Sequence, residues 1–209
     1  MHTDLVVQRP DAAAQTPAEL FLLFHGVGSD AEDMRPLAQA LATRRPGAWV
    51  VSVCAPQPSS WGAGWQWFSV QGVTEQNRPE RVAGALPAFR DRILAWQRET
   101  GVLAAQTRLI GFSQGAIMAL AATQAEAPSV AGRVIAIAGR LAEPAVRAPE
   151  ATSVHLIHGE HDGVMPVSLA ADAHRQLQAL GARVWLDRIE GLGHGIDARV
   201  LQAIAARLD

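Results

Sequence analysis

The segment Gly111-Phe112-Ser113-Gln114-Gly115 joins the apolar residues Leu109-Ile110 to a helix-forming stretch at 116–122. A strand that turns sharply into a helix at a Gly-x-Ser-x-Gly sequence is the context of a nucleophile elbow. The two glycines remove Cβ atoms that would clash in such a turn. The Ser113 hydroxyl is then presented at the top of a sheet, at the positive end of a helix dipole. The pattern becomes specific if an acid and a histidine follow it in that order.

Both residues follow, each behind a later apolar run. The predicted strand ending at His158 leads into the loop 159–163, which holds Asp162, and the predicted strand ending at Ile189 leads into 190–195, which holds His194. In open α/β sheets the carboxyl ends of the strands form the ligand-binding edge. The order Ser, Asp, His is that of the α/β-hydrolases. The sequence therefore predicts a catalytic triad of Ser113, Asp162 and His194.

The chemistry explains why these three residue types are needed. A serine hydroxyl is a weak nucleophile at neutral pH and needs a base to remove its proton during attack. His194 fits that role if a carboxylate, here Asp162, holds its imidazole in one tautomer and stabilises the imidazolium. The tetrahedral intermediate needs two N–H donors for its oxyanion, and we expect them at Gln114 and at Val27 in the loop after an earlier strand.

Other side chains compete for the same roles. His25 begins the loop of Val27 and is expected to order it by hydrogen bonding, whereas His155 and His158 lie on a strand and are more typical of structural groups. Among the acids, Asp187 lies within a strand, Asp197 stands where a helix cap is expected, and Glu160 adjoins the favoured Asp162. Position after a strand favours Asp162 and His194.

Apolar runs alternate with helical patterns along the whole chain. The alternation predicts an α/β-hydrolase fold with a mostly parallel sheet of about seven strands, helices on both faces and no separate cap domain. Residues 1–209 are expected to form a single domain. The predicted strands are 5–7, 19–24, 49–54, 107–110, 133–137, 154–158 and 182–189. The predicted helices are 30–44, capped by Ser29 or Asp30, 78–100, bent near Pro87, 114–125, 167–180 and 196–208.

Composition narrows the possible partners. A formal net charge of −2 gives no electrostatic reason to expect nucleic acid. No apolar stretch is long enough to span a bilayer, and the N-terminus lacks the basic and apolar segments of a secretion signal. The single cysteine excludes an intrachain disulfide. These features favour a cytoplasmic protein without an integral membrane segment.

The segment 56–77 carries four of the chain's eleven aromatic residues, Trp61, Trp65, Trp67 and Phe68. A loop of this length without regular structure of its own is often functional, and tryptophan can cover apolar surface while its N–H meets a polar group. One hypothesis makes this loop a wall of the substrate pocket, and the alternative packs its rings onto the core. Exposed apolar surface here could also mediate a homodimer.

Two further motifs suggest other functions. The sequence from Gly26 to Ala31 matches part of a dinucleotide-binding fingerprint, but the next predicted strand lacks the acidic residue expected at its end. The cluster from His158 to Asp162 lies at a strand end and lacks an established metal-ligand spacing. We therefore expect neither a cofactor nor a metal.

Four segments together resemble the phospholipase/carboxylesterase family, which includes acyl-protein thioesterases and small bacterial carboxylesterases. They are Leu23–Gly28, Gly111–Gly115, His158–Asp162 and Gly193-His194. The resemblance covers nearly the whole chain and implies hydrolysis of carboxylic or thiol esters of small molecules. It carries the triad onto Ser113, Asp162 and His194, and the oxyanion donors onto Val27 and Gln114.

The resemblance also implies substrate-contacting residues. The family's Trp-Phe pair, which contacts the acyl group, corresponds to Trp67-Phe68, and Met165 replaces the valine that often precedes the proline of the acid loop. We predict a carboxylesterase for short to medium acyl chains that uses an acyl-enzyme. The alternatives are an acyl-protein thioesterase or lysophospholipase-type enzyme with the same triad and, less favoured, a binding module without turnover.

Overall fold

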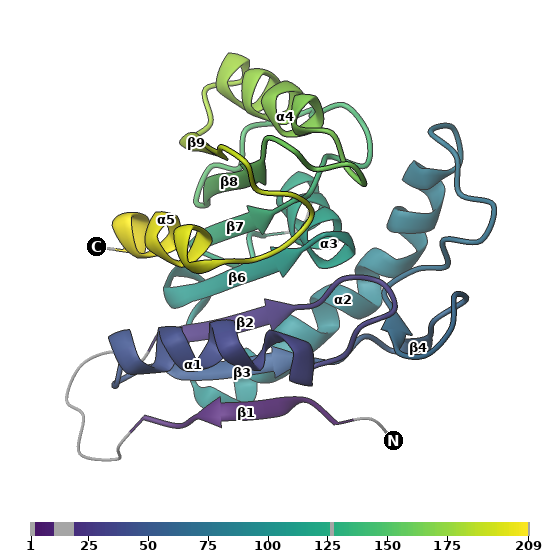
Figure 1. Cartoon of the computed structure of the whole chain (residues 1–209). Coiled ribbons are helices and arrows are strands. Elements are labelled where there is room, and N and C mark those ends of the chain that lie inside the picture. The colour runs from purple at the N-terminus through teal and green to yellow at the C-terminus, as the bar shows by residue number, and fades with distance from the viewer. Residues whose placement is uncertain (1–2, 11–18, 126–127, 209) are drawn as a thin grey trace.

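A computed structural model describes residues 3–10, 19–125 and 128–208 of the chain. These residues form a seven-stranded sheet in the order β1-β3-β2-β6-β7-β8-β9 (Figure 1). The first strand, β1, pairs antiparallel with β3, and the other neighbours are parallel. The strands are β1 (Leu5–Gln8), β2 (Leu20–Phe24), β3 (Trp49–Val53), β6 (Thr107–Phe112), β7 (Arg133–Ile137), β8 (Ser153–Gly159) and β9 (Val184–Ile189).

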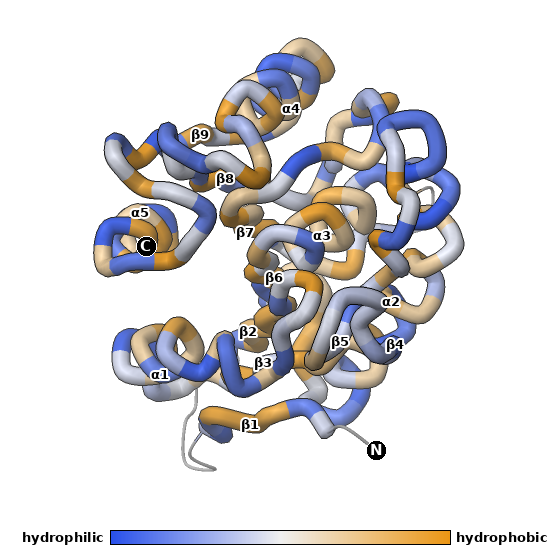
Figure 2. The backbone as a smooth tube through the Cα atoms, turned by 45° about the vertical axis from the view of Figure 1, so that its right-hand side comes forward, coloured by the Kyte–Doolittle hydropathy of each residue, from blue (hydrophilic) through white to orange (hydrophobic). Residues whose placement is uncertain are grey.

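Helices cover both faces of this sheet, so the predicted α/β-hydrolase architecture is confirmed. The helical elements are η1 (Glu32–Met34), α1 (Arg35–Arg44), α2 (Arg78–Thr100), η2 (Ala104–Gln106), α3 (Gln114–Gln124), α4 (Val167–Ala179) and α5 (Ala198–Leu208). Side chains of α2, α3 and α4 share one core cluster, and those of α1 and α5 share the other. Figure 2 shows α1 and α5 on one side of the strands and α2 and α3 on the other.

The central strands are apolar because both of their faces are covered. All five residues of β2 and all seven of β8 are buried. A strand covered on both faces has no solvent side and so loses the usual alternation of polar and apolar residues. This explains why β2 is recognisable in the sequence as a continuous apolar run, whereas β8 is equally buried but carries Ser153, His155 and His158.

Two details differ from the sequence-based expectations. The segment 56–77 was expected to lack regular structure, but it contains a small antiparallel hairpin of β4 (Gln57–Pro58) and β5 (Trp65–Gln66). Strands of two residues carry too little periodicity to be detected. The helix predicted from residue 30 begins as a 3₁₀ turn, and Asp30 caps it by accepting the N–H groups of Glu32 and Asp33 at 2.8 and 3.3 Å.

Candidate active site

Ser113 stands between β6 and α3 in a strained backbone conformation. Its φ and ψ are 52° and −114°, a region that non-glycine residues rarely occupy. The turn is tight because a Cβ on Gly111 would overlap the first turn of α3, and one on Gly115 would overlap the carbonyl of Phe24. The Ser113 N–H donates to the Ile137 carbonyl of the neighbouring strand at 2.9 Å. The elbow is thereby held at the carboxyl edge of the sheet.

His194 lies between Ser113 and Asp162. Its Nε2 is 2.9 Å from the Ser113 Oγ, and its Nδ1 is 2.7 Å from the Asp162 Oδ2. Since a carboxylate only accepts hydrogen bonds, Nδ1 carries the proton and Nε2 is left to accept from the serine hydroxyl. The Phe112 ring packs against the imidazole, with 5.0 Å between the ring centroids. The structure thus brings the three predicted residues together in the geometry that a serine nucleophile requires.

Asp162 is buried and kept ionised by its hydrogen bonds. Burial alone raises the pKa of its carboxyl, but the N–H groups of Met165 and Val164 and the ring of His194 outweigh burial and leave that pKa below its ordinary value. The two N–H groups donate to Oδ1 at 2.8 and 2.9 Å. His158 supports the same loop, because its Nε2 lies 2.7 Å from the Met165 carbonyl.

The loops of Asp162 and His194 are in direct contact. A Cβ on Gly159 would overlap the carbonyl of Leu192, so only glycine permits this approach. The N–H of His161 donates to that same carbonyl at 2.9 Å. The short separation between the acid and the histidine therefore follows from the close packing of two loops that are distant in sequence.

The competing acids have other partners. Asp187 accepts a hydrogen bond in its pairing with His155, at 2.7 Å, and Asp197 caps α5 by accepting the N–H of Arg199 at 2.9 Å. Glu160 pairs with Arg188 at 2.9 Å. The structural roles predicted for His155 and Asp197 are confirmed by these contacts.

The loop after β2 lies beside the nucleophile. A Cβ on Gly26 would lie 3.3 Å from the Ser113 Cβ, so the residue before Val27 is in close contact with the elbow. His25 orders this loop as predicted: its Nε2 accepts the Ala55 N–H at 3.0 Å, so its Nδ1 carries the proton and donates to the Gly26 carbonyl at 2.7 Å. Burial lowers the pKa of His25, which favours this neutral form. Gln114, as the first residue of α3, has no intrahelical acceptor for its N–H.

The aromatic residues of segment 56–77 divide into exposed and buried ones. Trp61 is 71% exposed at the tip of the hairpin, whereas Trp67 and Phe68 are 3% and 5% exposed and belong to the core cluster of α2 and α3. The remaining surface of Trp67 lines a cavity of about 450 Å³ against α2, and Met165 is half-buried behind Asp162. Core packing, the alternative reading, therefore holds for Trp67 and Phe68, and contact of either ring with a substrate stays a prediction.

Sequence reasoning missed two features of the same edge. The Gln114 side chain, 2% exposed, bonds to the backbone of Trp67 and Phe68. Ala138, directly after β7, has a φ of 49°, a strained value close to the 52° of Ser113 after the neighbouring strand β6. Neither feature has a local sequence signal, because each depends on contacts between distant segments.

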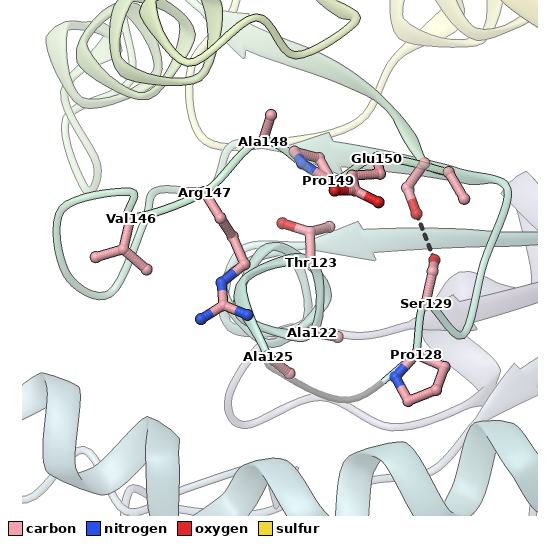
Figure 3. A pocket seen from close by; sticks show the side chains of 12 residues that line it. Ala122, Thr123, Ala125, Pro128, Ser129, Val146, Arg147, Ala148, Pro149 and Glu150 are labelled. Atoms are coloured by element: carbon pink, nitrogen blue, oxygen red, sulfur yellow. Dashed lines mark hydrogen bonds between the residues drawn. The ribbon is translucent and has the colours of Figure 1, made fainter.

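A second cavity of similar size lies at the other end of α3. Its volume is about 470 Å³. Figure 3 shows the side chains that line it, among them Thr123, Arg147 and Glu150. Since an α-helix rises about 1.5 Å per residue, roughly 15 Å of helix separate Thr123 from Ser113. This cavity is therefore not part of the candidate active site.

Among the residues that the structure describes, no helix has both the length and the apolar character needed to cross a bilayer. Within the same residues, no three histidine, cysteine or acidic side chains gather as a set of metal ligands.

Comparisons with known proteins identify the family and the fold of the chain. A family model described as Phospholipase/Carboxylesterase matches residues 2–209. The chain is 48% identical over 201 residues to the esterase YpfH of Escherichia coli (strain K12), covering 96% of this chain and 85% of that protein. The crystal structure of esterase PE8 has a TM-score of 0.85 at 30% identity and covers 99% of this chain and 96% of its own. The Bacillus cereus carboxylesterase, at 16% identity, shares the fold with a TM-score of 0.79, over 97% of this chain and 91% of its own.

Proposed function

The chain belongs to the phospholipase/carboxylesterase family and is a serine ester hydrolase, and we propose that Ser113, His194 and Asp162 are its catalytic triad. One observation carries this proposal: the imidazole of His194 lies within hydrogen-bond distance of both the Ser113 hydroxyl and the Asp162 carboxylate. Residues 1–209 are proposed to form one catalytic domain that acts on small-molecule esters.

The reaction proceeds in two halves. The Ser113 Oγ attacks the ester carbonyl while His194 Nε2 takes the hydroxyl proton, and the oxyanion accepts hydrogen bonds from the N–H groups of Val27 and Gln114. The carbon–oxygen bond to the alcohol then breaks, and His194 returns the proton to the departing alcohol. Water, deprotonated by His194, attacks the acyl-enzyme carbonyl. The bond to the Ser113 Oγ then breaks, and His194 returns the proton to that oxygen as the acid leaves. Asp162 holds the imidazole throughout.

We propose that the acyl chain is short to medium in length. The support comes from the loops beside the elbow, which are joined by a bidentate ion pair from Arg140 to Glu75 at 2.9 and 2.6 Å. Arg78 adds a second contact to Glu75 at 2.8 Å. On this proposal a short or medium chain would end near Met165, the proposed contact residue, without reaching these charges. Trp67 and Phe68 would support, from the core, the pocket wall that the segment 56–77 is proposed to form.

The decisive experiment compares wild type with the Ser113→Ala variant on p-nitrophenyl esters of increasing acyl length. The variant should lose up to about a millionfold in kcat with its fold intact. Labelling by a serine-directed fluorophosphonate should also disappear. Turnover that survives the substitution would exclude the assignment of Ser113.

The same panel separates the other proposals. A preference for long chains or for thioesters would favour the acyl-protein thioesterase alternative. A protein that neither turns over esters nor reacts with the fluorophosphonate would be a binding module. Action without a cofactor and a cytoplasmic location complete the proposal, and a homodimer stays a prediction.

A further inference from the structure

The side chain of Gln114 connects the elbow to the aromatic segment. Its Oε1 accepts the Trp67 N–H at 2.8 Å, and its Nε2 donates to the Phe68 carbonyl at 2.7 Å. Both bonds are buried. The side-chain amide thus pairs with one backbone N–H and one backbone carbonyl, as the backbone of a neighbouring strand would. Because buried polar groups are costly when unpaired, these two bonds define the position of the segment against the first turn of α3.

The indole of Trp67 makes a second connection, to the loop after β2. Its Nε1–H donates to the His25 carbonyl at 2.9 Å, and this bond is also buried. The ring is fixed by edge-on contacts, with centroids 5.5 Å from Phe24 and 5.2 Å from Phe89. His25 stands two residues before Val27, so the indole holds the loop that carries one proposed oxyanion donor.

Trp67 therefore touches both halves of the proposed oxyanion hole. Its backbone N–H bonds to Gln114, whose own N–H is one donor, and its indole bonds to the loop of Val27, which supplies the other. We infer that Trp67 and the Gln114 side chain are positioning residues that set the spacing between the two oxyanion donors. This inference rests on the proposed function and assigns Trp67 a part in the reaction other than contact with the acyl group.

The physical reason is the narrow geometry of an oxyanion hole. Donors stabilise the transition state when they lie about 2.7–3.1 Å from the position of the developing charge. The two donors here belong to separate segments, the loop after β2 and the start of α3. Without a tie between these segments, small movements would lengthen one hydrogen bond to the oxyanion while ground-state binding stayed almost unchanged.

The experiment removes each tie with the least change of shape. Trp67→Phe deletes the indole N–H but keeps an aromatic ring between Phe24 and Phe89, and Gln114→Met deletes both amide bonds at similar length. We expect kcat to fall about tenfold to a hundredfold in each variant, less than for loss of a whole donor, with KM changed by less than about twofold. The affinity for a trifluoromethyl ketone, which forms a tetrahedral adduct with the serine, should fall by the same factor as kcat/KM.

Trp96→Phe is the matched control. Trp96 is also buried, and its Nε1–H donates to the Asp4 Oδ2 at 2.7 Å, so the substitution deletes an indole hydrogen bond on α2, in this case to a carboxylate. The control should keep wild-type kcat and ketone affinity even if its melting temperature falls as much as that of Trp67→Phe.

Three outcomes would overturn the inference. These are unchanged kcat and ketone affinity in the Trp67 and Gln114 variants, an equal loss of kcat in the Trp96 control, and a loss that appears only in KM. Failure of the proposed function would look different, because wild-type turnover would then survive Ser113→Ala.

Discussion

Among the described residues, two histidine–aspartate pairs link β8 or its following loop to β9 or its following loop, and only one of them reaches a nucleophile. In both pairs a ring nitrogen lies 2.7 Å from a carboxylate oxygen. His155 and Asp187 lie within the two strands, whereas Asp162 and His194 lie in the loops that follow β8 and β9. The same pair chemistry is therefore placed once in the interior of the sheet and once at its carboxyl edge.

The surroundings of the second ring nitrogen separate the two pairs. His194 is 18% exposed, and its Nε2 faces the Ser113 hydroxyl. His155 is fully buried, and among the described residues its Nδ1 has no hydrogen-bond partner. A short His–Asp distance is thus insufficient for catalysis. The pair must also lie at the edge where a strained turn presents a nucleophile.

The largest expected effect on kcat comes from replacing His194 by alanine, and the matched variant replaces His155. His194→Ala should reduce kcat by about a millionfold, because the serine loses its base. His155→Ala should leave kcat within about threefold in the folded fraction, since that ring contacts no reacting group. Steady-state kinetics on a p-nitrophenyl ester tests both, and a large loss of kcat in folded His155→Ala would erase the proposed distinction.

The next effect concerns the acids. Asp162→Ala should lower kcat by about ten-thousandfold, because His194 loses the group that holds its tautomer. Asp187→Ala should change kcat by less than about threefold. If Asp162→Ala were as active as Asp187→Ala, one of the competing acids would have to replace Asp162 in the proposed triad.

The positions of these pairs differ in how well the sequence foretells them. Ser113, Asp162 and His194 each follow a recognisable strand, and parallel strands place such residues at one edge. The pairing of His155 with Asp187 depends on the register of β8 against β9. That register sets Ile157 opposite Asp187, and His155 lies two residues before Ile157 on the same face of the sheet. No local pattern encodes that register. The Gln114 side-chain bonds are equally hidden, because they join residues 46 and 47 positions apart.

Stability should depend on the pair of His155 and Asp187, although activity should not. Asp187→Ala leaves a buried imidazole without its acceptor, at a cost of about 1–3 kcal/mol in the free energy of unfolding. The contact of Asp187 with Arg207, at 3.6 Å and partly exposed, should add little. Urea unfolding at pH 7.5 measures the difference from wild type. A variant as stable as wild type would mean that the interior pair does not stabilise the fold.

The smallest effect is the dependence of stability on pH. Burial lowers the pKa of His155 from its ordinary value of 6.5, although Asp187 opposes the shift and Arg207 and Arg133 reinforce it. The unfolded chain therefore takes up a proton at higher pH than the folded one. The contribution of His155 is complete above its unfolded pKa and is lost as pH falls from there toward the lower folded value, by at most about 1.4 kcal/mol per pH unit.

His155→Gln removes this titration while an amide can still bond to Asp187. The free energy of unfolding should then fall less steeply between pH 7.5 and 5.5 than in wild type, by urea titration at each pH. Part of the slope should remain, because burial also lowers the pKa of His25, which both proteins contain. If the free energy of unfolding had the same pH dependence in both proteins, protonation of His155 would not destabilise the fold. The pKa of His155 would then not distinguish its pair from that of His194.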